Sequence, residues 1–356
     1  MLTLYVDEPR WRAHLAAVMS ARPGTVPVVK GNGYGFGLPR LARVAAELGA
    51  DTLAVGTYAE VADVEAFPGS VMVLTPWREP RTQPTSEERL VHTIGRREDL
   101  VGLVRSSSGA RPRVVLELLT SMRRHGFTAR GLRQVADDPA FAGIEVEGFA
   151  LHLPLPPPTT DPRKAARGGH LAEVERLLTD LVASGIASRR VYVSHLSEAE
   201  LVALGRSYGD FNLRPRTGTG LWLGDRDALR PRATVLDVHE LTRGDRYGYR
   251  QRQAPRHGHL VVVAGGTTHG IGLEAPGGSG ALRDRAARFA RGGLDAVGLV
   301  RSPYTVGGRQ RLFAEPPHMQ VSMLFLPAGG VVPSVGDEVE VAVRYTTTAF
   351  DRVVIS

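Results

Sequence analysis

The chain has 356 residues, of which 42% are apolar and 23% charged, and its formal net charge is +7. The proportions of apolar and charged residues are typical of a globular protein. The length exceeds that of one ordinary domain, so we expect more than one. The basic residues are scattered rather than gathered in runs, which argues against nucleic acid as a partner. The absence of cysteine excludes thiol nucleophiles, disulfides and thiolate metal sites, and we expect no bound metal.

The N-terminus, MLTLYVDEPRWR, lacks the basic segment and apolar stretch of a secretion signal. No segment reaches the roughly 18 uninterrupted apolar residues of a membrane span. We therefore predict a cytoplasmic protein with no membrane association.

Between residues 10 and 225, apolar strand-like runs alternate with segments such as LAEVERLLTDLVASG, whose apolar residues have helical spacing. The predicted strands are Val26–Lys30, Thr52–Thr57, Ser70–Thr75, Val91–Ile94, Arg113–Leu118, Val146–His152, Arg190–His195 and Leu213–Trp222. Eight strands alternating with helices favour a (β/α)8 barrel of the TIM type, with a doubly wound open sheet as the alternative.

After about residue 230 the pattern changes to short strands separated by glycine and proline. The strand-like segments are RATVLDVHEL, GHLVVVAG, AVGLVR, HMQVSMLFL, DEVEVAVRY and RVVIS, and ALRDRAARFARG has a helical pattern. We therefore predict a barrel domain at 10–228 and a C-terminal mainly-β domain at 229–356. We expect the short strand in residues 1–9 to pair with the second domain.

The stretch VPVVKGNGYGFG ends the first predicted barrel strand at Lys30 and continues with four glycines in seven residues. Barrels of this type carry their chemistry at the C-terminal ends of the strands. A partly desolvated lysine there has a lowered pKa and is a nucleophile toward carbonyls. The alternative is a lysine that reaches solvent from a strand end. The glycine spacing fits neither a dinucleotide-binding loop nor a P-loop.

Residues Val28–Gly37, VVKGNGYGFG, resemble the cofactor-lysine motif of the alanine racemase family, V-V-K-A-N-A-Y-G-H-G. The resemblance implies that Lys30 holds pyridoxal 5′-phosphate (PLP) as a Schiff base, and that the Tyr34 hydroxyl contacts the phosphate. Two alanines of the motif are glycines here, and its histidine is Phe36.

Other stretches resemble the same family in the same order, over nearly the whole chain. VVLELLTSMRRHGF places Arg124 on an arginine that holds the cofactor and the substrate carboxylate. FALHL places His152 beneath the pyridine ring, and LRPRTGTGLWLG places Arg216 against the ring nitrogen. The resemblance also implies phosphate contacts from Ser197, Gly218 and Thr219, and a substrate contact from Met319.

An arginine against the ring nitrogen keeps that nitrogen unprotonated, because a permanent cation disfavours another nearby. A cofactor held in this way is a weaker electron sink. This favours removal and return of the α-proton over transamination.

The resemblance breaks at the second proton-transfer group. The family uses a tyrosine from the partner subunit, in G-Y-A-D-G-Y-P-R, where VAGGTTHGIGLEAP here has Gly266. His269 is a nearby substitute, since histidine moves protons near neutral pH; the alternative is an ordinary loop histidine. Tyr345 is the nearest match to the family's phosphate-binding tyrosine near the C-terminus.

Three functions stay open. We predict a PLP-dependent amino-acid racemase or epimerase, with alanine as the family default and Lys30, His269 and Arg124 as catalytic residues. The alternatives are a PLP enzyme of another type, such as a decarboxylase, and a cofactor-binding or regulatory relative without catalysis. The family resemblance further implies a homodimer whose active sites are shared between subunits, with a small amino acid as ligand.

Overall fold

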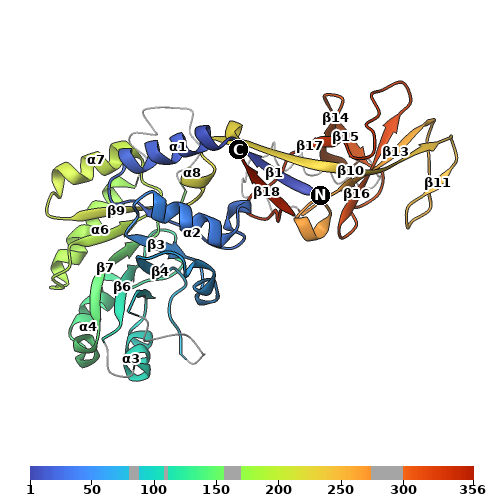
Figure 1. Cartoon of the computed structure of the whole chain (residues 1–356). Helices are drawn as coiled ribbons and strands as arrows, with labels where there is room; N and C mark the ends of the chain where they lie inside the picture. The colour runs from blue at the N-terminus through green and yellow to red at the C-terminus, as the bar shows by residue number, and fades with distance from the viewer. Residues whose placement is uncertain (80–87, 108–110, 156–169, 274–299) are drawn as a thin grey trace. The chain divides into compact units, whose positions relative to one another are not determined.

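The structure, a computed structural model, describes residues 1–79, 88–107, 111–155, 170–273 and 300–356. The chain forms two compact units (Figure 1). The barrel unit comprises Arg12–Gly33 and Gly37–Gly224, and the β unit comprises Met1–Trp11, Tyr34–Phe36 and Asp225–Ser356.

The barrel unit is built on eight parallel strands in the order β2-β9-β8-β7-β6-β5-β4-β3. They are β2 (Val26–Pro27), β3 (Thr52–Val55), β4 (Ser70–Val73), β5 (Leu90–Ile94), β6 (Arg113–Leu118), β7 (Glu145–Leu151), β8 (Arg190–Val193) and β9 (Asn212–Thr217). A parallel bridge between Val28 and Ala54 joins β2 to β3 and closes the ring. The predicted (β/α)8 barrel is therefore confirmed, and the open sheet is excluded.

Helices lie around the strands of this ring (Figure 1). Among the described residues, the α-helices are α1 (Glu8–Ala21), α2 (Leu38–Glu47), α3 (Arg97–Ser106), α4 (Ala129–Ala136), α6 (Leu171–Ala183), α7 (Glu198–Ser207) and α8 (Thr219–Trp222). In α6, Val174, Leu177, Leu178 and Leu181 recur at helical spacing and are buried in the same apolar cluster as strand residues such as Leu151. Burial of this face, more than helix propensity, holds the helix in place.

The last predicted barrel strand, Leu213–Trp222, is shorter than the sequence indicated. Strand β9 ends at Thr217, and Thr219–Trp222 form α8. Gly218 leaves the extended conformation at φ −118° and ψ −80°. The Trp222 side chain is fully buried and its Nε1 donates to the carbonyl oxygen of Val28 at 2.8 Å. A tertiary contact therefore decides the conformation of an apolar run that resembles a strand.

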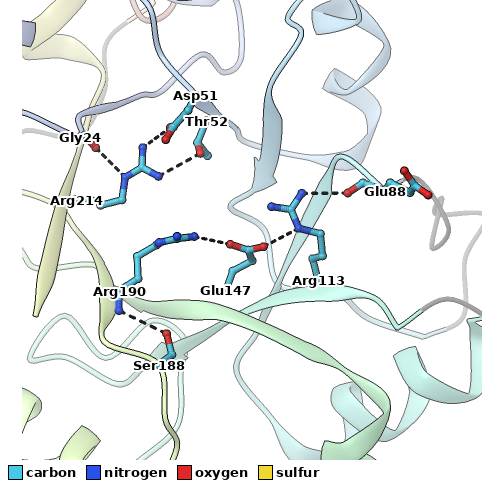
Figure 2. Close-up of polar contacts among 9 residues, drawn as sticks. All are labelled: Gly24, Asp51, Thr52, Glu88, Arg113, Glu147, Ser188, Arg190 and Arg214. Atoms are coloured by element: carbon cyan, nitrogen blue, oxygen red, sulfur yellow. Dashed lines mark hydrogen bonds and ion pairs between the residues drawn. The ribbon is translucent and has the colours of Figure 1, made fainter.

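Charged residues pair near the N-terminal ends of the strands (Figure 2). The partly buried Glu147 carboxylate accepts from Arg113 and from Arg190, each at 2.6 Å. Arg214 pairs with Asp51 in the same region. This end of a barrel usually serves the stability of the fold, whereas residues that carry chemistry lie at the C-terminal ends of the strands.

The β unit contains an eight-stranded sheet in the order β13-β16-β15-β14-β17-β10-β1-β18, and β13 also pairs with β10. Its strands are β1 (Leu2–Val6), β10 (Leu229–Leu241), β13 (Gly258–Ala264), β14 (Arg301–Val306), β15 (Arg309–Phe313), β16 (Val321–Pro327), β17 (Glu338–Val341) and β18 (Arg352–Ile355). A small hairpin pairs β11 (Arg246–Tyr247) with β12 (Arg252–Gln253). Strand β1 runs antiparallel to β10 and parallel to β18.

Two sequence patterns in this unit had different outcomes. Strand β15 has the sequence RQRLF, whose polar residues gave no strand signal; it pairs with β14 across Gly307 and Gly308. The helical pattern ALRDRAARFARG and most of AVGLVR lie outside the described residues. Among the residues that the structure does describe, no helix is long and apolar enough to cross a membrane.

Candidate active site

Lys30 follows the closing strand of the barrel. The N–H of Val28 donates to Thr217 at 2.8 Å, and that of Val29 donates to Ala54 at 2.7 Å. The backbone that continues from β2 is thus held between both neighbouring strands up to Val29, the residue before the lysine. Lys30 leaves the barrel at the C-terminal end of β2, the end at which this fold carries chemistry.

The charge of Lys30 is disfavoured where it lies. Burial is the main cause that lowers the pKa of its amine, and the cations Arg124 and Arg216 lower it further. The Glu60 carboxylate raises it in part. The lysine residue is nonetheless exposed, so its amine is both open to a ligand and biased toward the neutral, nucleophilic form.

Arg216 and Glu117 are opposite charges buried in the barrel. Arg216 donates from Nη2 to the carbonyl of Leu151 at 3.1 Å, and its Nε has no partner among the described residues. Glu117, on β6, likewise has an unpaired Oε2. Burial raises the pKa of Glu117, and the charges of Arg216 and Arg124 oppose that rise. Both side chains have hydrogen-bonding capacity left for a ligand.

His152 follows β7 and stays neutral. Burial lowers the pKa of its imidazole to about 3, with further lowering by Arg216 and Arg124. Its Nδ1 lies 3.1 Å from the Ser194 hydroxyl. The ring centroids of His152 and His195 lie 5.2 Å apart. The backbone of His195 has φ 62°, a left-handed conformation unusual for histidine, and its Nδ1 bonds to the carbonyl of Leu153 at 2.6 Å. Such strain clusters at functional sites.

The predicted phosphate contacts of the barrel unit differ in their surroundings. The N–H groups of Gly218 and Thr219 at the start of α8 have no acceptor among the described residues. Ser197 instead caps helix α7: its hydroxyl donates to the Glu200 carboxylate at 2.7 Å and accepts from the Glu200 N–H. A carboxylate on that hydroxyl is a helix-capping arrangement and weighs against a phosphate contact.

Four of the residues that the family resemblance singled out belong to the β unit. Tyr34 is buried in a left-handed turn at φ 55°. Both ring nitrogens of His269 are bonded, Nδ1 to the N–H of Gly266 at 3.2 Å and Nε2 to Asp351 at 3.0 Å. Met319 is 69% exposed. The ring of Tyr345 is buried under the Arg226 guanidinium, and burial raises its pKa to about 12.

The barrel-unit residues fit a cofactor with an aldehyde, a heteroaromatic ring and a phosphate. Lys30 offers a nucleophilic amine, and Arg216 offers an unpaired buried N–H. His152 offers a neutral ring, and Gly218 and Thr219 offer free backbone donors of the kind that bind phosphate. Sequence reasoning missed Glu60, Glu117, Ser194 and His195. An isolated acid within the apolar run VVLEL was the one available signal among them.

Comparison with known proteins identifies the family. Residues 6–224 match the family described as the N-terminal domain of alanine racemase. The chain belongs to the alanine racemase family. The alanine racemase of Nitratidesulfovibrio vulgaris is 27% identical over 278 residues, 72% of each chain. That of Desulforamulus reducens is 34% identical over 132 residues, a match that spans only 36% of that protein.

Solved structures of alanine racemases have the same fold. The enzyme from Bartonella henselae, described with covalently bound pyridoxal phosphate, superimposes with a TM-score of 0.71 at 16% identity and covers 100% of this chain and 99% of its own. The enzyme from Streptomyces lavendulae gives 0.70 at 19% identity, covering 100% and 97%. At these sequence identities, the similarity to the solved structures is one of fold alone.

The backbone around Gly266 leaves no room for a side chain. A Cβ atom on Gly266 would lie 2.2 Å from the carbonyl oxygen of His318 and 2.5 Å from that of Met319. The segment runs beside residues 318–320, with the N–H of Thr267 bonded to His318 and that of Thr268 bonded to Met319. The backbone of residues 318–319 therefore accounts for the glycine at position 266.

Proposed function

We propose that the protein is a PLP-dependent amino-acid racemase, with alanine as its first candidate substrate. The observation that carries the proposal is the state of Lys30. Its amine is open at the C-terminal end of a barrel strand while burial and two arginines lower its pKa. The family's membership and fold support the same reading.

Each side chain has a role in this proposal. Lys30 binds the aldehyde of the cofactor and holds or returns a proton at Nζ. Arg216 donates its unpaired N–H to the ring nitrogen, and neutral His152 lies against the ring. Gly218 and Thr219 hold the phosphate through their backbone N–H groups. Arg124, an exposed cation close enough to lower the pKa of Lys30, binds the substrate carboxylate.

When bound, PLP supplies an electron sink that acidifies the α-proton of an amino acid. The protein must then remove the proton from one face of Cα and return one to the other. Lys30 serves one face. The second group comes from a partner subunit in this proposal, which therefore includes a homodimer with shared sites.

The test is an absorbance titration with PLP, followed by L-alanine in D2O. We expect a visible imine band that Lys30→Ala abolishes, and appearance of D-alanine with deuterium at Cα. Imine formation that persists in Lys30→Ala would contradict the assignment of the lysine. Lys30→Arg is the matched control, because it keeps the charge but cannot form the imine.

The second candidate is a cofactor-binding protein without racemase activity. The closed position at Gly266 favours it, because that position can supply no second base. An imine band without deuterium exchange for any amino acid offered would select this candidate over the racemase.

A further inference from the structure

A histidine–glutamate pair lies beside the position where the second base is missing. His318 Nε2 lies 2.6 Å from the Glu315 carboxylate. The carbonyl oxygen of His318 is the atom that a Cβ on Gly266 would strike. The pair therefore adjoins, within the β unit, the backbone that carries the tyrosine in the family.

Glu315 is fixed before it meets the histidine. Its side chain is 2% exposed, and its carboxylate also accepts the N–H groups of Tyr249 at 3.2 Å and Arg250 at 3.4 Å. The turn that contains Gly248 packs directly on the Glu315 carboxylate, because a Cβ on Gly248 would lie 2.3 Å from one of its oxygens. An anchored carboxylate sets both the orientation and the tautomer of a bonded imidazole.

This bonding leaves one nitrogen of His318 available. With Nε2–H donating to Glu315, Nδ1 is the ring nitrogen that can accept a proton, and it makes no hydrogen bond within the described part of the chain. The side chain is 23% exposed. A held carboxylate, an oriented imidazole and a free basic nitrogen are the arrangement of a general base.

The pair opens on a hollow of about 550 Å³ in the surface of the β unit. The hollow is lined by Tyr249, Arg250, Thr267, Glu315, Pro316, Pro317, His318, Met319, Gln320 and Val321. The Tyr249 ring lies over His318, with centroids 4.5 Å apart, and is 85% exposed. Met319 is 69% exposed. Large apolar side chains exposed together around a hollow are typical of a surface that another molecule covers.

His269 is less suited to the task. Its Nδ1 accepts from the backbone of its own turn, and its Nε2 bonds to Asp351, which in turn accepts the N–H of Leu2. Nδ1 therefore holds the turn together, and Nε2 ties the turn to strand β1 through Asp351. Proton transfer at His269 would break one of these bonds, whereas His318 Nδ1 has none to break.

We propose that His318, oriented by Glu315, is the second proton-transfer group, and that it acts in the site that holds Lys30 of the partner subunit. This inference rests on the proposed racemase function. His318 Nδ1 takes the α-proton of the amino acid. The Cα–H bond breaks and an N–H bond forms, and the electron pair of the broken bond stays with the substrate. Lys30 Nζ then returns a proton to the opposite face, and the reverse reaction uses the same groups in reverse order. Glu315 is a positioning residue that stabilises the imidazolium.

The first test is His318→Gln, with His239→Gln on the surface of β10 as the matched control. Loss of a general base lowers racemisation by about 10²–10⁴-fold, while the control should stay within threefold of wild type, on the order of a surface substitution. The variant should still exchange the α-proton of one enantiomer, through Lys30, and lose exchange of the other. Racemisation at the wild-type rate in His318→Gln would overturn the inference. Loss in His269→Asn alone would assign the role to His269.

The second test asks whether the two groups come from different subunits. Lys30→Ala and His318→Gln chains, each inactive, are co-expressed with different tags. Half of the dimers are then mixed and each has one intact site, so about a quarter of wild-type activity should return. No recovery in isolated mixed dimers would overturn the shared site. Wild-type protein that binds PLP but exchanges no α-proton would refute the proposed function itself.

A third test needs no cofactor. Nitrogen-15 NMR of the imidazoles should show His318 protonated on Nε2 in wild type. In Glu315→Gln, the amide can donate to Nε2 and shift the proton to Nδ1, with a fall in kcat and little change in KM. A proton on Nδ1 in wild-type protein would contradict the proposed base.

Discussion

The carboxylate of Glu60 accepts a hydrogen bond at 3.0 Å from the N–H of Gly31, the residue directly after Lys30. Its other oxygen accepts the N–H of Gly56 at 2.7 Å. One side chain thus joins the glycine-rich turn after β2 to the end of β3. The same charge raises the pKa of Lys30 against the effects of burial and of the arginines. Glu60 therefore fixes where the lysine lies and how readily it loses its proton.

Glu60→Gln should lower the pKa of Lys30 further, because it removes the negative charge that opposes the effects of burial and of the two arginines, while keeping an acceptor oxygen. The pH at which the protein forms an imine with PLP should shift downward. Visible absorbance against pH measures the shift, and exposed Glu65 replaced by Gln is the control. An unchanged profile would mean that the carboxylate acts on the loop alone.

Glu117→Gln should raise stability at neutral pH. Burial raises the pKa of Glu117 above 4.5, so the carboxylate is less favoured in the folded protein than in the unfolded chain. The protonated form of Glu117 therefore stabilises the folded protein. This stabilisation is fully present below pH 4.5 and is lost as the pH rises through the raised pKa of the folded protein. The variant, which mimics the protonated acid, should therefore have the higher urea midpoint at pH 7–8.

The two proteins should converge as the pH falls to about 4. Activity should fall in the variant, because Arg216 and Arg124 lose their shared counter-charge. Such a trade of stability for activity is common at functional sites. A variant less stable than wild type at pH 8 would show that attraction to the arginines outweighs the cost of burying the carboxylate.

The barrel could be predicted because its strands are apolar runs at regular intervals, and Lys30 because a charge ends one of them. The limits of that reasoning appear at Trp222, whose apolar run is helical because its indole bonds to Val28. Glu60 and Glu117 could not be found from the family motifs, since their importance depends on which charges the fold brings near Lys30. The Ser197 hydroxyl matched a motif loosely, and Glu200 three residues later is the signal for a cap.

His152 should contribute to the loss of folding stability as the pH is lowered. Its pKa is about 3 in the folded protein against 6.5 as the ordinary value. Between these values the unfolded chain binds a proton that the folded protein does not, so this residue lowers stability as the pH falls from 6.5. His152→Asn should lose stability less steeply between pH 6.5 and 4, as measured by thermal unfolding. His239→Asn on the surface is the control, and parallel curves for His152→Asn and wild type would contradict the low pKa.

Gly266→Tyr, which restores the family's residue, should fail to restore the family's chemistry. A Cβ there would meet two carbonyl oxygens, those of His318 and Met319, at 2.2 and 2.5 Å. Even Gly266→Ala forces the two backbones apart, and such overpacking costs about 1–3 kcal/mol. Gly330→Ala is the matched control in the same unit, since its nearest neighbour is 3.7 Å away. Because the shift would also move His318, racemisation should fall in Gly266→Ala in parallel with stability. A tyrosine variant with wild-type stability and higher activity would show that the backbone opens to admit the ring, and that the closed position is not what separates this protein from its relatives.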